Sequence, residues 1–131
     1  MLSISDVLLD PHGFKPWQFP DPETVYSGII VTAPAVCYRL NENGVPQRTP
    51  EGVHRWALWL SVKTDDDYRG FCIDRNPIAR AFNGNATERN LRRLAERWRV
   101  SGVLQLSWTR DGGGKRVYRG RYMAPGQTDM M

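Results

Sequence analysis

The 131 residues predict one domain with a core of its own, and no apolar run approaches the ~20 residues that cross a bilayer, so we expect no membrane span. The start, M-L-S-I-S-D-V-L-L-D, lacks the basic residues and the long apolar core of a signal peptide, which favours a cytoplasmic protein. The net charge of +4 is unevenly distributed: residues 1–65 carry 5 basic and 7 acidic side chains, whereas residues 66–131 carry 13 basic and 7 acidic.

Residues 1–23 are expected to form an N-terminal arm. Ser3–Leu9 can form one or two helical turns, and the four prolines that follow, at 11, 16, 20 and 22, disfavour further regular structure. Phe14, Trp17 and Phe19 lie among these prolines, so we expect the arm to pack on its own molecule or on a neighbour.

Two strands and a long loop are predicted next. Thr24–Leu40 forms one long strand, bent at Gly28 and interrupted at Pro34, which cannot donate to a ladder. Asn41–Gly52 is a loop long enough to be functional or mobile. Val53–Lys63 alternates, with one face made of Trp56, Leu58, Leu60 and Val62 and the other of Arg55, Ala57, Trp59, Ser61 and Lys63. We therefore expect Trp59 on the polar face, unless the arm or a second subunit covers it.

One helix is predicted, after a third strand. Thr64–Asp67 is a solvated acidic turn rather than a metal site, Tyr68–Asp74 is a short strand, and Arg75–Gly84 is a connector. Asn85–Arg99 forms the helix, capped by Asn85 or Thr87, with an apolar stripe at helical spacing: Leu91, Leu94, Ala95 and Trp98. Its arginines are better explained as a solvated back than as a second binding surface.

A hairpin is predicted after the helix. Gly102–Arg110 directs Leu104, Leu106 and Trp108 inward, the glycines of Asp111–Gly114 make the tip, and Lys115–Met123 is the fifth strand. In that strand Arg119 and Arg121 face solvent if Tyr118 and Tyr122 face inward, and the opposite phase remains open. Ala124–Met131 is expected to be a disordered tail.

The predicted fold is mainly β, with the order of three strands, one helix and two strands over residues 24–123. This order, together with the stretch R-V-S-G-V-L-Q-L-S-W at 99–108, resembles the oligonucleotide/oligosaccharide-binding (OB) fold, a five-stranded Greek-key barrel with its helix between strands three and four. Bacterial and phage single-stranded DNA-binding proteins resemble this chain in element order. The resemblance implies a ligand lying across strands two and three, beside the first long loop and the loop between strands four and five. The end, Asp129-Met-Met, departs from the acidic tip common in that family.

The candidate contacts lie on that implied surface and suit an unpaired strand of nucleic acid. Of the 18 basic residues 15 are Arg, whose planar guanidinium binds phosphate and stacks on rings; the alternative is that they only solvate a surface. Flat rings stack on unpaired bases, which contributes ~1–3 kcal/mol per base with little sequence preference. The expected contacts are Arg48, Arg55, Trp56, Trp59, Lys63, Tyr68, Arg69, Arg75, Arg110, Lys115, Arg116, Arg119 and Arg121.

Two functional hypotheses follow. The first is a non-enzymatic protein that binds single-stranded DNA, or RNA, in replication, recombination or a mobile element such as a phage or plasmid. The second is a small barrel used as a protein-interaction or assembly module, with the arm and Trp59 at the interface. In either case a homo-oligomer, dimer or larger, is expected.

An enzyme is not expected. The chain has no phosphate-binding glycine loop and no Ser, His and Asp set or Cys and His set with family spacing. Cys37 and Cys72 are expected to be reduced and buried, and with His12 and His54 they lack the spacing of a metal site. We therefore expect no catalytic residue, no metal and no cofactor.

Overall fold

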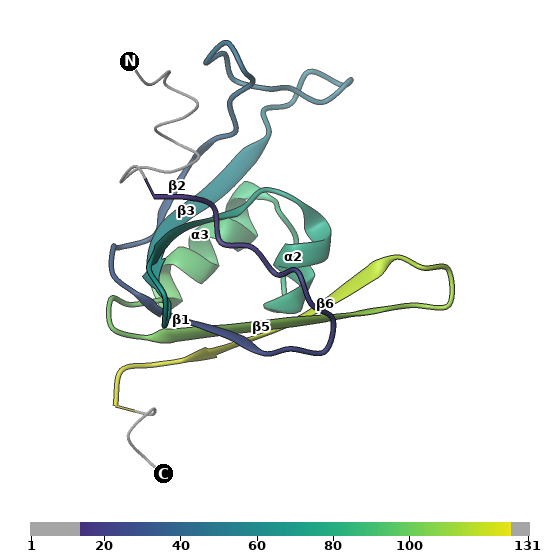
Figure 1. Ribbon diagram of the computed structural model, residues 1–131. Helices are drawn as coiled ribbons and strands as arrows, with labels where there is room; N and C mark the ends of the chain where they lie inside the picture. Colours follow the sequence, from purple (N-terminus) through teal and green to yellow (C-terminus); the bar gives the residue numbers. More distant parts are fainter. Residues whose placement is uncertain (1–13, 127–131) are drawn as a thin grey trace.

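The computed structural model describes residues 14–126 and shows a mainly β protein with two helices (Figure 1). Its elements in chain order are β1 (Tyr26–Ile30), β2 (Ala35–Tyr38), β3 (Trp56–Lys63), β4 (Tyr68–Ile73), α2 (Asn76–Ala81), α3 (Glu88–Arg97), β5 (Val103–Arg110) and β6 (Arg116–Met123). None of the helices within residues 14–126 has the length and apolar character needed to cross a membrane. The helical turns expected at Ser3–Leu9 and the tail from residue 127 lie outside the described residues.

The six strands form one antiparallel sheet, in which β2, β3, β1, β5 and β6 are neighbours and β4 pairs with β3. The single strand expected over Thr24–Leu40 is divided: β1 pairs with Val62 and Lys63 of β3, and β2 pairs with Trp56–Trp59 of the same strand. The break falls just before β2, where Pro34 has no N–H to donate. The strand count is therefore six rather than five. Among residues 14–126 no pairing joins β4 to β6, so the expected closed barrel is not confirmed.

The described part of the arm, residues 14–23, packs on its own molecule, which confirms one of the two alternatives expected for it. The Trp17 N–H donates to the Gly70 carbonyl oxygen (2.8 Å), and the Gly70 N–H donates to the carbonyl oxygen of Lys15 (2.9 Å), so the arm runs beside β4. Further along, the Trp108 indole N–H donates to the Phe19 carbonyl oxygen (2.6 Å). Trp17 and Phe19 are buried in the core, and the arm thus bridges the space between β4 and β5.

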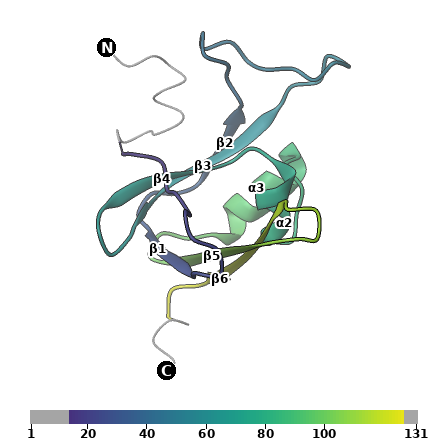
Figure 2. The same ribbon diagram turned by 45° about the vertical axis from the view of Figure 1, so that its right-hand side comes forward.

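Both helices lie inside the bend of the sheet, between β3 and the β5–β6 hairpin (Figure 1 and Figure 2). The helix expected over Asn85–Arg99 is α3, and the hydroxyl of Thr87 caps it by accepting from the Asn90 N–H. Leu91, Leu94 and Trp98 of the predicted stripe are buried in the core. The prediction of a single helix was wrong, because α2 occupies the expected connector, where a proline at the start of the helix is compatible with its first turn.

The β5–β6 hairpin has the predicted strands and tip. Arg110 faces Arg116 across the turn, and the register continues to Val103 opposite Met123. Tyr118 and Tyr122 pack against the core, whereas Arg119 and Arg121 are exposed, so the phase left open is the one with these arginines in solvent. Gly120 lies on the inner face, and the ring of Phe82 occupies the position that a Cβ atom would take there.

We expect Gly120→Ala to lower the free energy of unfolding by about 1–3 kcal/mol, because the added methyl overlaps the Phe82 ring in a packed core. Urea denaturation followed by tryptophan fluorescence measures this change. Gly112→Ala is the matched control, since its Cβ meets no atom within 4 Å and stability should be almost unchanged. Equal stability of the two variants would contradict the packing described here.

Candidate nucleic-acid interface

Four arginines converge at one end of the sheet and line a groove of about 880 Å³. Arg55 precedes β3, Arg75 follows β4, and antiparallel strands place the start of one beside the end of the other. Arg89 comes from the first turn of α3, and Arg39 lies at the end of β2. We call this feature the arginine groove, lined by these four residues together with Gln47, His54, Trp56, Asp74 and Glu88, among others.

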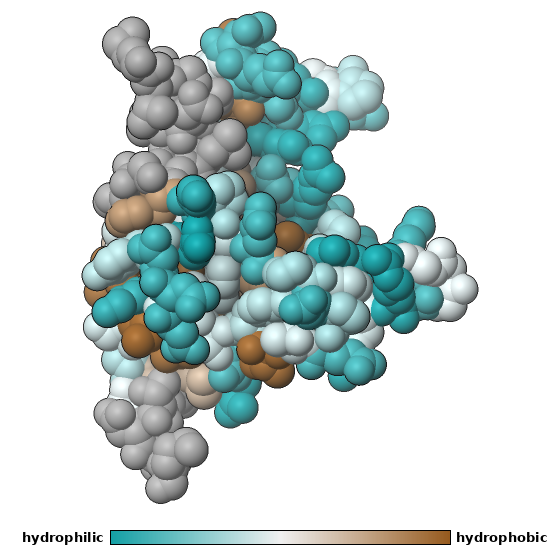
Figure 3. Space-filling model, in the orientation of Figure 1, coloured by the Kyte–Doolittle hydropathy of each residue, from teal (hydrophilic) through white to brown (hydrophobic). Residues whose placement is uncertain are grey.

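One wall of the groove is the segment 39–55, which contains the loop predicted at Asn41–Gly52. It is a ladder at its base: the Gln47 N–H donates to the Arg39 carbonyl oxygen (2.8 Å), and the Arg55 N–H donates to the carbonyl oxygen of Gln47 (2.9 Å). Two isolated bridges, Leu40 with Pro46 and Arg48 with His54, extend the pairing. These bonds hold Arg39 and Arg55 side by side at the base of the segment, which projects from the molecule, is mostly hydrophilic and is seen at the top of Figure 1 and Figure 3.

The charge of the groove is only partly neutralised. Asp74 pairs with Arg39, with 3.1 Å between carboxylate oxygen and Nε, and this ion pair ties the wall to the end of β4. Glu88 pairs with Arg92 on α3 at 2.9 Å. Among residues 14–126, no carboxylate lies within 4.0 Å of Arg55, Arg75 or Arg89. Three guanidinium groups therefore face the groove with their hydrogen-bond donors available to an anion.

Aromatic rings accompany these cations. Trp56 is half-buried in the groove wall and lies 4.6 Å from the Tyr38 ring, measured between centroids. The His54 ring stacks on Tyr38 at 4.1 Å, and the Arg92 guanidinium lies 5.5 Å from the Trp56 centroid. The rings of His54, Tyr38 and Trp56 thus form a continuous set, of which His54 and Trp56 border the groove.

Trp59 does not stand on an exposed face, and the structure corrects that expectation. Its side chain is only 5% exposed, and its neighbours on the same face, Ala57 and Ser61, are fully buried. Alternation assigned the residue to the correct face of β3, but β3 has partner strands on both edges and is buried on both faces. In this conformation the Trp59 ring is closed to a base.

The two cysteines flank Trp59 on neighbouring strands and are free thiols, partly buried. Burial raises the pKa of the Cys37 thiol, and the Trp59 indole partly offsets this effect. Burial also raises the pKa of Cys72, and the charge of Asp74 raises it further. Since the thiolate is the reactive form, neither group is disposed to act as a nucleophile. In the described part of the chain no three His, Cys, Asp or Glu side chains gather as metal ligands would.

The remaining expected contacts lie elsewhere. Arg110 and Arg116 lie over Trp108, with guanidinium carbons 5.2 and 3.9 Å from the ring centroid, and Lys115 is exposed beside the hairpin tip. Arg48 donates to the Gly52 carbonyl oxygen (2.9 Å) within its own loop. Arg119 and Arg121 lie on the outer face of β6, away from the groove lining.

Lys63 and Tyr68 lie together at the end of β3 opposite to the arginine groove. The Lys63 ammonium lies 5.8 Å from the Tyr68 centroid, and the Phe14 ring stacks on Tyr68 at 5.1 Å, so part of this tyrosine is already covered.

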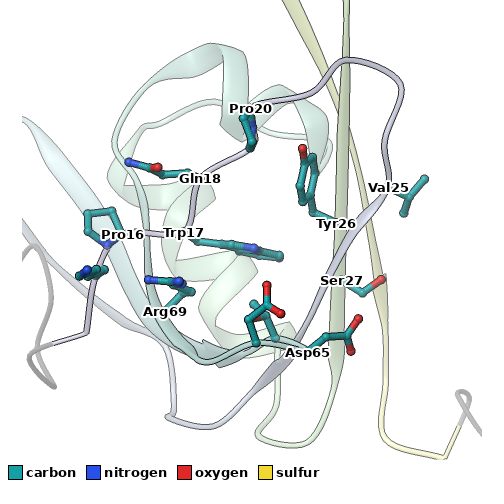
Figure 4. A pocket seen from close by; sticks show the side chains of 12 residues that line it. Pro16, Trp17, Gln18, Pro20, Val25, Tyr26, Ser27, Asp65 and Arg69 are labelled. Carbon is teal, nitrogen blue, oxygen red and sulfur yellow. The ribbon is translucent and has the colours of Figure 1, made fainter.

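Arg69 lines a second hollow, of about 580 Å³, beside the arm. Figure 4 shows the indole of Trp17 there, between the Tyr26 ring and the side chains of Arg69 and Asp65. In this hollow Asp65 and Asp66 balance the two cations of the lining, whereas the arginine groove has four arginines and two carboxylates, so this hollow suits phosphate less well.

The structure thus gathers Arg55, Trp56 and Arg75 of the expected set and adds Arg39, Arg89 and His54, which sequence reasoning did not select. No sequence pattern marks these three residues. They lie at the ends of strands or helices that come together only when distant strands pair.

No family model, curated protein or solved structure matches this chain.

We expect iodoacetamide to alkylate Cys72 at least about tenfold more slowly in the folded chain than in guanidinium, at a pH of about 8.5. The raised pKa keeps the folded thiol protonated at a pH where the unfolded thiol is partly thiolate. Mass spectrometry of tryptic peptides over time measures the rate at each cysteine. Equal rates in the folded and unfolded chains would contradict the burial described for this residue.

Proposed function

We propose that this chain binds single-stranded nucleic acid, DNA in the first place, in the arginine groove, and that it does so without catalysing a reaction. The observation that carries the proposal is the trio Arg55, Arg75 and Arg89, unpaired with any described carboxylate and placed around the half-buried Trp56. Concentrating three unpaired cations costs repulsion, which a bound polyanion relieves.

The chemistry of the groove favours an unpaired strand over a duplex. Guanidinium groups bind phosphate oxygens in a planar, bidentate manner, and Trp56 and His54 offer flat surfaces to bases. In a duplex the base faces are stacked on one another, so these rings would contribute little there. The volume of about 880 Å³ lies within the range of about 300–1,000 Å³ usual for ligand sites, so we propose that the groove holds one or two nucleotides.

The strand order supports a distant, open relative of the OB fold as the finer description. β1 and β2 are the two halves of a broken first strand, and both pair with β3, as a bent first strand in such a barrel would. β1 also pairs with β5, the first strand after the helices, and β5 with β6. The groove then lies beside the first long loop, where ligands bind in that fold.

Affinity for a labelled oligo-dT should fall about tenfold or more in each of Arg55→Ala and Arg75→Ala, because each loses a charge-assisted hydrogen bond to phosphate. Fluorescence anisotropy over a series of salt concentrations measures this, and the slope of log affinity against log salt should become shallower by about one per lost contact. Arg93→Ala, on the exposed back of α3, is the matched control. A flat response to salt, or equal loss in the control, would overturn the proposal.

Quenching of intrinsic fluorescence provides an independent test, because the tryptophans differ in exposure. Trp59, Trp98 and Trp108 are buried, and Trp17, which borders the second hollow, is 9% exposed, so the half-buried Trp56 is the tryptophan most accessible to a base. Oligo-dT should quench the wild-type chain, and the quench should disappear in Trp56→Phe. Parallel titrations with oligo-rU and with duplex compare RNA and double-stranded DNA. An undiminished quench in Trp56→Phe would show that bases stack elsewhere.

A further inference from the structure

The last strand, β6, is an edge of the sheet. Its eight residues pair with β5 from Arg116 to Met123, and among residues 14–126 no other strand pairs with it. In an antiparallel ladder every second residue directs its N–H and C=O toward one neighbour, so alternate residues of β6 direct theirs away from β5. Such a row of backbone donors and acceptors is a template for one more strand.

This edge is held rigidly from the inner side. Tyr122 and Tyr118 pack against the core, and the Tyr122 hydroxyl accepts a hydrogen bond from the Arg99 N–H (3.1 Å). Gly120 lies directly against the Phe82 ring. A rigid strand does not lose further conformational entropy when a partner pairs with it, which favours binding.

The outer face of β6 is basic and lacks compensating acids. Arg119 and Arg121 are exposed, and the β5 residues opposite them, Ser107 and Gln105, are uncharged. In the described part of the chain no carboxylate lies within 4.0 Å of either arginine. Val117, which is 43% exposed, lies on the same face and adds an apolar side chain to it.

These arginines also determine which partner fits. If a second copy added its own β6 in antiparallel register about Gly120, Arg119 of each strand would face Arg121 of the other, and like charges directly opposite are destabilising. A strand with carboxylates at alternate positions would instead place one carboxylate opposite Arg119 and another opposite Arg121. Complementarity of charge therefore favours an acidic partner over a second copy of this chain.

We propose that the free edge of β6 binds an extended, acidic segment of another protein as an added β-strand. Backbone hydrogen bonds to β6 would supply affinity, and Asp or Glu side chains at alternate positions would pair with Arg119 and Arg121. This surface is separate from the arginine groove, so the inference does not depend on nucleic-acid binding.

The experiment titrates the full chain with a fluorescent peptide of about ten residues, in which Glu alternates with Val or Thr, and measures anisotropy. We expect binding of this peptide, none of the peptide with Lys in place of Glu, and at least a tenfold loss in Arg119→Glu/Arg121→Glu. Arg93→Glu/Arg97→Glu, exposed on α3, is the matched control and should bind as the wild type does. Circular dichroism checks that both double variants are folded.

N-methylation of the peptide distinguishes strand addition from simple charge attraction. Methylating the alternate amides whose N–H groups point toward β6 should abolish binding, whereas methylating the amides that point away from β6 should leave binding intact. The proposal would be overturned if the peptide did not bind, or if methylation abolished binding with neither set of amides or with both sets. It would also be overturned if the two double variants lost affinity for the peptide equally. So would loss of oligo-dT binding, or dissociation of an oligomer, in Arg119→Glu/Arg121→Glu without an effect on the peptide.

Discussion

The structure depends on the double pairing of β1, which joins β3 on one side and β5 on the other. Gly28 makes this possible, because a Cβ atom there would lie 2.8 Å from the Cβ atom of Val62. After β1 the chain leaves the ladder, and the Val31 N–H donates to the Ser61 carbonyl oxygen (2.9 Å) while the Thr32 hydroxyl accepts from the Ser61 N–H (2.8 Å). These bonds hold the break in place, so β2 rejoins β3 in a defined register.

The arginine groove is a consequence of that break. Because β2 pairs with the first half of β3, the segment that joins them projects beyond the sheet and forms a wall. The ion pair between Arg39 and Asp74 fixes this wall to the end of β4, with both side chains mostly shielded from water. The shielding strengthens the pair relative to a surface ion pair. With Arg39 paired, Arg55, Arg75 and Arg89 are the groove's available cations.

The two surfaces proposed for binding differ in their physical basis. The groove combines unpaired guanidinium groups with rings, which suits a flexible polyanion with flat bases. The edge of β6 offers backbone donors and acceptors in a straight row, which only another extended chain can satisfy. Trp108 of β5 lies under Arg110 and Arg116 and donates its indole N–H to the arm, so the hairpin is also anchored to the rest of the core.

The sequence by itself determined the stretches that form strands, though not their number, together with the apolar stripe of α3, the hairpin and the break near Pro34, because each depends on periodicity or on one residue's backbone chemistry. Only the tertiary structure decided that Trp59 is buried, since alternation assigns a side chain to a face but does not say whether that face is covered. The helix α2 has only six residues, and its proline lies at the start, where a helix tolerates it, so no strong local pattern marked the segment; packing of Phe82, at its end, against Gly120 of β6 holds it in place. The arginine groove was also beyond the sequence, because Arg39, Arg55, Arg75 and Arg89 meet only through pairing between distant segments.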